Sequence, residues 1–113
     1  MSKYLISFPS DAMVVSEAEF PQVVADSHAV VHEAKSAGVW VFGGGIDEAV
    51  APVRVEADGT VLPGAYAHAH PLTGGFTVIE APSREVALEW AARFARACRC
   101  PQEVRQFGDD AES

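Results

Sequence analysis

The chain has few of the features that mark secreted, membrane-spanning or disulfide-stabilised proteins. Only two cysteines occur among its 113 residues, Cys98 and Cys100, and residues so close in sequence cannot join distant segments. No apolar run approaches the ~20 residues that a membrane-spanning helix needs, and the first residues do not resemble a secretory signal. We therefore expect a cytosolic protein without membrane contact, with one reduced thiol in the core and one in a loop.

Positive charge is also scarce. Eight Lys and Arg residues face sixteen Asp and Glu residues, which gives a formal net charge of −8. Nucleic acids and anionic membranes are bound through clustered Lys and Arg, so neither is expected as a partner. A hydrophobic content of 49% and this length predict one globular domain over residues 1–108. Residues 109–113 are expected to form an acidic, disordered tail.

Hydrophobic spacing predicts two helices and six strands. A spacing of about 3.6 residues indicates helices over 21–36 and 84–98, with Gly38 ending the first and Ser83 capping the second. Alternation or short apolar runs indicate strands over 4–8, 39–42, 53–57, 60–62, 76–80 and 103–107. Asp58-Gly59 is a strong turn signal, so the third and fourth strands form a hairpin.

This order predicts an α+β fold. With the hairpin counted as an insertion, the order is βαββαβ, which is typical of a ferredoxin-like antiparallel sheet with both helices on one face. The opposite face of the sheet, with residues such as Tyr4 or Trp40, would then be bare. In so small a chain we expect a second copy to cover it, giving a homodimer.

The four histidines are the most specialised residues, and they form two pairs. His28 and His32 are four residues apart on the first helix, and His68 and His70 are two apart after the hairpin. Either spacing can bring two imidazoles to one metal ion or substrate. Histidines that merely pack at a boundary or face solvent are the alternative for each. His28 lies at the edge of the helix's apolar stripe, whereas His32 is on its polar side.

Three segments of the second half carry a family resemblance. Residues 74–80 (GGFTVIE), 85–92 (EVALEWAA) and 103–105 (EVR) resemble the YCII-related family, including its DGPF-motif branch. The resemblance extends over residues 3–107. It implies a ferredoxin-like protomer in a dimeric α/β barrel, with a cleft between helix and sheet. Some members of the family are linked to dechlorination of hydroxylated aromatics and others to sigma-factor regulation.

The resemblance also suggests site residues, although the chain departs from the DGPF motif itself. Some YCII-like proteins pair a helix histidine with an aspartate after the next strand, which correspond here to His28 and Asp47. At the motif, this chain has Pro63-Gly-Ala-Tyr66 in place of DGPF. His68 and His70 stand where the branch has Glu and Lys. No role of that Glu-Lys pair therefore transfers to this chain.

Three hypotheses follow. The chain is a small enzyme in which His28 acts as a general base oriented by Asp47, on a small aromatic or enol-type substrate. It is instead a dimeric ligand-binding or regulatory module without chemistry. Or it holds a divalent metal such as zinc through His68 and His70, completed by Asp47 or His28. Tyr66 and Trp40, together with His68 and His70, are the residues expected to contact a small-molecule ligand in the first two cases.

Overall fold

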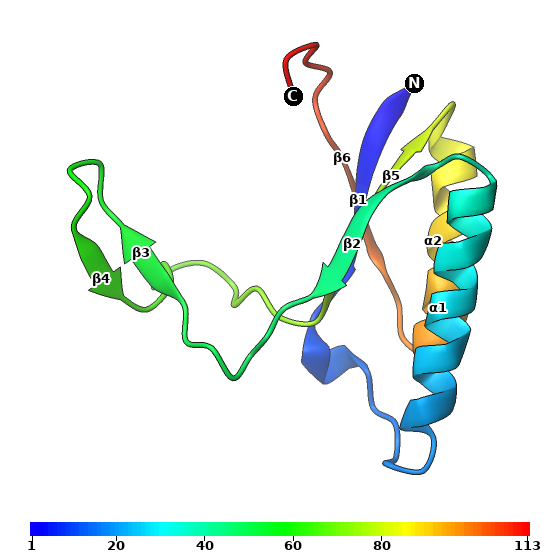
Figure 1. The fold of residues 1–113 in the computed structure, drawn as a ribbon, viewed down its shortest axis with the longest axis horizontal. Helices are drawn as coiled ribbons and strands as arrows, with labels where there is room; N and C mark the ends of the chain where they lie inside the picture. The colour runs from blue at the N-terminus through cyan, green and yellow to red at the C-terminus, as the bar shows by residue number, and fades with distance from the viewer.

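The computed structural model describes all 113 residues as a small α+β fold with an arm projecting from it (Figure 1). Both helices lie on one side of a four-stranded sheet, and the arm extends from the other side. In chain order the elements are β1 (Ser2–Phe8), the 3-10 turn η1 (Ser10–Ala12), α1 (Phe20–Ser36), β2 (Trp40–Gly45), β3 (Val53–Val55), β4 (Val61–Pro63), β5 (Gly75–Ala81), α2 (Arg84–Cys98) and β6 (Glu103–Gln106).

The main sheet has the strand order β2-β5-β1-β6, and every neighbouring pair is antiparallel. Strands β3 and β4 form a separate two-stranded sheet. The predicted βαββαβ order with an inserted hairpin is thus confirmed. No helix of the chain has both the length and the apolar character needed to cross a membrane.

Local signals at the helix ends work as the sequence predicts. After α1, Gly38 adopts φ +75°, and its N–H donates to the carbonyl of Lys35 while that of Val39 donates to the carbonyl of Ala34. These two bonds satisfy carbonyls that the helix end would leave free. At the start of α2, the Ser83 hydroxyl accepts the N–H of Val86 at 3.2 Å.

The core lies between the helices and one face of the sheet. Tyr4, Ile6 and Ile79 project from this face and are 3%, 1% and 0% exposed. They pack with residues of α1 and α2, including Ala34 and Trp90. Strand alternation shows which residues share a face but not which face the helices cover.

The prediction that Tyr4 and Trp40 lie on the bare face is therefore wrong. Tyr4 belongs to the core, and the half-buried Trp40 packs against it. The bare face carries the alternate residues of the strands: Leu5, Phe42, Phe76 and Val78. Phe42 is 67% exposed, so this face remains apolar and uncovered along part of its length.

Residues 46–74 form the projecting part, which we call the arm. Its base is closed by the Ile46 N–H, which donates to the carbonyl of Gly74 at 2.9 Å. The hairpin β3–β4 stands away from the helices and from the main sheet (Figure 1). Because of the arm, the radius of gyration is 15.8 Å, compared with about 13 Å for a compact domain of this size.

Candidate functional site

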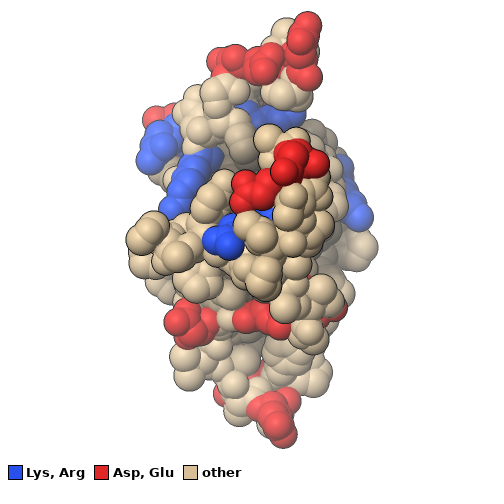
Figure 2. Space-filling view, turned by 90° about the vertical axis from the view of Figure 1, so that its left-hand side faces the viewer, with Lys and Arg blue, Asp and Glu red and all other residues tan.

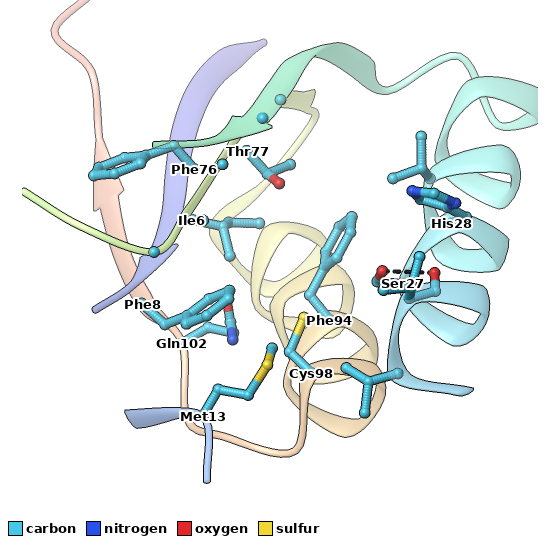
Figure 3. Close-up of a pocket in the computed structure, with 18 of the residues that line it drawn as sticks. Ile6, Phe8, Met13, Ser27, His28, Phe76, Thr77, Phe94, Cys98 and Gln102 are labelled. Carbon is cyan, nitrogen blue, oxygen red and sulfur yellow. Dashed lines mark hydrogen bonds between the residues drawn. The ribbon is translucent and has the colours of Figure 1, made fainter. Parts of the chain in front are cut away.

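A cavity of about 1000 Å³ opens between α1 and the helix-facing side of the sheet (Figure 3). Its origin is a set of glycines at positions where a strand would normally send side chains toward the helix. Gly43 and Gly45 are two apart in β2, and they pair with Thr77 and Gly75 of β5. All of them therefore share the helix-facing side.

Two aromatic rings use the space that the glycines leave. A Cβ atom on Gly43 would lie 2.5 Å from the Trp40 ring, and one on Gly75 would lie 2.7 Å from the Phe8 ring. Each ring thus lies close against a glycine of the sheet. At Gly45 a Cβ would meet only the carbonyl oxygen of Gly74, at 3.7 Å, so this position is open. These glycines keep room between sheet and helix.

The inner part of the cavity is apolar. Ile6 comes from β1 and Phe94 from α2, and Val31 lines the side formed by α1. Met13, from the segment between η1 and α1, lies at another edge (Figure 3). The Phe76 ring points away from this space, toward the bare face (Figure 3). A mostly apolar hollow with a few polar groups is typical of small-molecule sites.

Polar groups enter the cavity from two sides. His28, His32 and Lys35 come from α1, so His28 is one of the predicted site residues that line the cavity. Glu48, at the base of the arm, also lines the cavity, and its Oε1 accepts the Ser10 hydroxyl at 3.0 Å. The cavity thus holds an imidazole and a carboxylate, the groups that acid–base chemistry requires.

Asp47, in contrast, does not line the cavity. Its carboxylate accepts the N–H of Ala49 at 3.1 Å, and its carbonyl accepts the N–H of Val50 at 3.2 Å. The side chain is therefore engaged in its own turn, as aspartate commonly is in loops. It forms neither a hydrogen bond nor an ion pair with His28, so the structure does not bring the two predicted partners together.

The remaining predicted residues separate into two groups. Trp40 lines the cavity, and its ring centroid lies 5.9 Å from the Nζ of Lys35. Tyr66, His68 and His70 lie on the exposed part of the arm and do not line the cavity. No three His, Cys, Asp or Glu residues in the chain are placed to hold a metal ion. A zinc site at His68 and His70 would need ligands from outside the chain.

Sequence reasoning misses part of the site. His32 is exposed, as expected for the polar side of α1, but it also lines the edge of the cavity. Glu48 carries no signal in the sequence, since one carboxylate in a loop has no distinguishing spacing. The glycines do carry a signal: two glycines with a spacing of two on a strand leave one face without side chains.

Both cysteines are buried at one end of this region, and both are free. Cys98 lines the cavity beside Phe94 (Figure 3). Burial, with a smaller contribution from Cys100, raises the pKa of the Cys98 thiol from 9.0 to about 11. Burial also raises the pKa of Cys100, against the opposing hydrogen bond from Gln102. Cys100 lies in the loop between α2 and β6, as predicted, but its thiol is buried there.

The raised pKa of Cys98 predicts slow alkylation and a loss of stability in alkali. Below pH 9 the thiol is protonated in both the folded and the unfolded chain, so its full contribution to the free energy of unfolding is present. Between pH 9 and about 11 the unfolded thiol ionises first, so folding stability falls, by on the order of 1 kcal/mol. Urea unfolding at pH 7 and pH 10 measures this, and Cys98→Ala is expected to reduce the difference. An equal difference in the variant would contradict the assignment to Cys98.

Comparison with known proteins gives a fold relationship. No family model matches the sequence, and no curated protein does. Among solved structures, a 5-chloro-2-hydroxyhydroquinone dehydrochlorinase from Burkholderia phenoliruptrix, in complex with 2,5-dihydroxybenzoquinone, is similar in fold. The TM-score is 0.53 with 97% of each chain covered, at 15% sequence identity. The two chains share a fold. At this identity, the likeness alone does not extend to activity.

Proposed function

We propose that this chain is a YCII-like acid–base enzyme that binds a small hydroxylated aromatic in the cavity between α1 and the sheet. The observation that carries the proposal is the cavity itself, which combines an apolar interior with His28 and Glu48 at its polar edge. Aromatic rings such as those of Phe8 and Trp40 offer flat surfaces for a ring-shaped ligand. The similar solved structure is an enzyme that acts on a compound of this class.

In this proposal His28 accepts the proton of a ring hydroxyl. This proton is placed on the chlorine-bearing ring carbon, which gives a keto form; removal of the proton of a second hydroxyl then expels chloride and leaves a quinone. Of the two hydroxyl protons, one stays on the ring carbon and the other is lost with chloride as HCl. The overall reaction, loss of HCl from the substrate, needs no external oxidant or reductant. Glu48, rather than Asp47, is the carboxylate that lines the cavity and is available to bind a second hydroxyl. Proton abstraction by a positioned histidine is a common source of rate enhancement.

The cavity can be tested by filling it. Gly45→Val adds a side chain on the helix-facing side where a Cβ has an ordinary contact, whereas Gly44→Val adds the same group at a position with free space on the opposite face. With 2,5-dihydroxybenzoquinone as the probe, we expect Gly45→Val to weaken binding at least ~10-fold and Gly44→Val to leave it unchanged. Isothermal titration calorimetry measures both. Equal affinities for the native chain and Gly45→Val would reject the cavity as the binding site.

A ligand-binding or regulatory module without chemistry is the second candidate. One observation favours it: no side chain forms a hydrogen bond with His28, so nothing in the free chain fixes its tautomer. Binding of the probe by the native chain, without turnover of a chlorinated analogue at any pH between 6 and 9, would favour this candidate. The cytosolic location remains a prediction from sequence.

A further inference from the structure

Lys35 places an unpaired positive charge at the cavity. It is the only Lys or Arg residue among those that line the cavity, and Glu48 is the only Asp or Glu residue. The ion pairs of the chain use other basic residues: Lys3, Arg93, Arg99 and Arg105. Because the chain has twice as many acidic as basic residues, a cavity-lining cation without a carboxylate partner is a notable exception, and it is available to a ligand.

The Trp40 ring holds this charge at the space between helix and sheet. The ring lies against the helix-facing side of β2, because a Cβ on Gly43 would meet its Cη2 atom at 2.5 Å. The Lys35 Nζ lies 5.9 Å from the centroid of the ring, within the range of a cation–π contact. Side chains on a helix also lean toward its N-terminus, which for Lys35 is the direction of His28. The ammonium is therefore directed along the cavity rather than past the end of α1.

The two charged groups lie at opposite ends of the cavity. Strand β2 runs back along α1 (Figure 1), so Lys35 lies beside the start of β2, whereas Glu48 follows its end. The six residues of β2 span roughly 17 Å. His28 is seven residues before Lys35 on α1, so it lies about 10 Å from it along the helix axis, toward the Glu48 end. This interval leaves room for an aromatic ring between the imidazole and the ammonium.

The charge of the whole molecule does not attract anions. The formal net charge is −8, and in the view from the arm side acidic side chains gather at the two ends of the molecule and at the front (Figure 2). A negatively charged ligand that enters the cavity therefore needs a local positive charge, which Lys35 supplies. One ammonium group beside apolar walls fits a singly charged carboxylate. A phosphate carries more negative charge than one ammonium can compensate.

We propose that Lys35 determines the specificity of the cavity, and that the ligand is a hydroxylated aromatic acid whose carboxylate binds the Lys35 ammonium. The inference rests on the function proposed above, because it concerns the same cavity, and it narrows the class of substrate. The ring then lies between α1 and the glycines of β2, with a hydroxyl directed to His28 and the carboxylate at the Trp40 end. Glu48, at the other end, repels the carboxylate and so disfavours the reversed orientation.

Two probes of nearly the same shape test the role of the charge. The first, 2,5-dihydroxybenzoate, carries a carboxylate where the second, 2,5-dihydroxybenzamide, carries an uncharged amide. In calorimetry at pH 7 and low salt, we expect the native chain to bind the acid about 5–10-fold more tightly than the amide. Lys35→Met keeps an unbranched side chain but removes the charge, and it is expected to weaken only the acid and so abolish the preference. Lys35→Arg is expected to keep most of it. Equal affinities of the native chain for the two probes would overturn the proposal.

Arg96→Met is the matched control for the change in net charge. Arg96 is exposed on α2, forms no ion pair and does not line the cavity, so the preference for the acid is expected to persist. If Arg96→Met abolishes the preference as Lys35→Met does, the overall charge rather than Lys35 determines it, and the proposal is wrong. It is also wrong if Lys35→Met weakens both probes equally, because that result indicates a structural role.

The two proposals can fail separately. The comparison of acid and amide needs no turnover, so a preference that depends on Lys35 would stand even if no chlorinated substrate reacts. Conversely, binding of 2,5-dihydroxybenzoquinone that Gly45→Val weakens, without any preference for the acid over the amide, would support the cavity as the binding site and overturn the role of Lys35.

Discussion

Replacing Gly74 with alanine is expected to destabilise the fold by about 3–5 kcal/mol. Gly74 has φ +77°, a conformation that costs other residues energy, and a Cβ there would lie 2.1 Å from the carbonyl oxygen of Phe8. The opposing atom belongs to the backbone of β1 and has no rotamer by which to move. The free energy of unfolding of a natural domain is about 5–15 kcal/mol in total, so the substitution would remove much of the stability. Urea unfolding of the two proteins measures the difference.

Gly64→Ala separates the two causes. Gly64 also has a positive φ, +86°, but nothing lies within 4 Å of the added Cβ. Only the backbone strain applies there, and we expect a cost of about 1–2 kcal/mol. If the two variants lower the free energy of unfolding by the same amount, the close approach of the arm base to β1 does not contribute to the cost, and the steric explanation for Gly74 is wrong.

Replacing His28 with glutamine is expected to lower turnover of a chlorinated hydroquinone by about 10²–10⁴-fold, the usual contribution of a general base. Glutamine keeps a polar side chain of similar length on α1, so the cavity retains its shape. Binding of 2,5-dihydroxybenzoquinone is expected to change by no more than a few fold. Chloride release under saturating substrate measures kcat, and calorimetry measures the affinity.

His32→Gln is the matched control for this variant. His32 is one turn along the same helix and also lines the cavity, so the change removes an imidazole from the same region. We expect its kcat to stay within a few fold of the native value. If His32→Gln lowers turnover as strongly as His28→Gln, the base has been assigned to the wrong histidine. If neither variant lowers a measurable turnover, His28 is not the base.

The fold could be predicted because its signals are local. The left-handed Gly38, the Ser83 cap and the Asp58-Gly59 turn each act within a few residues, and each is present in the structure. The prediction of which sheet face the helices cover was wrong for Tyr4. The alternating pattern of β1 is the same whichever face is covered, so it does not decide between them. That choice is made by long-range packing with α2, in particular with residues such as Trp90.

The site was predicted less well than the fold. His28 was found because it lies at the edge of an apolar stripe, where a helix passes from core to opening. Asp47 was placed by the family resemblance, but a shift of one residue in a loop decides whether a carboxylate meets the cavity or closes a turn. In the structure Glu48 lines the cavity, whereas the Asp47 carboxylate accepts a hydrogen bond within its own turn. Loop conformation depends on contacts such as Ser10 with Glu48, which are 38 residues apart.

The strand order also determines when the chain can fold. β1 is an inner strand, and its two neighbours, β5 and β6, come from the last third of the sequence. β2 pairs only with β5, so β1, α1 and β2 cannot form a sheet by themselves. During synthesis, β1 therefore has no strand to pair with until Gly75–Ala81 has been made. Its second edge stays unpaired until Glu103–Gln106 follows. During synthesis, the apolar first strand depends on late residues for protection from aggregation.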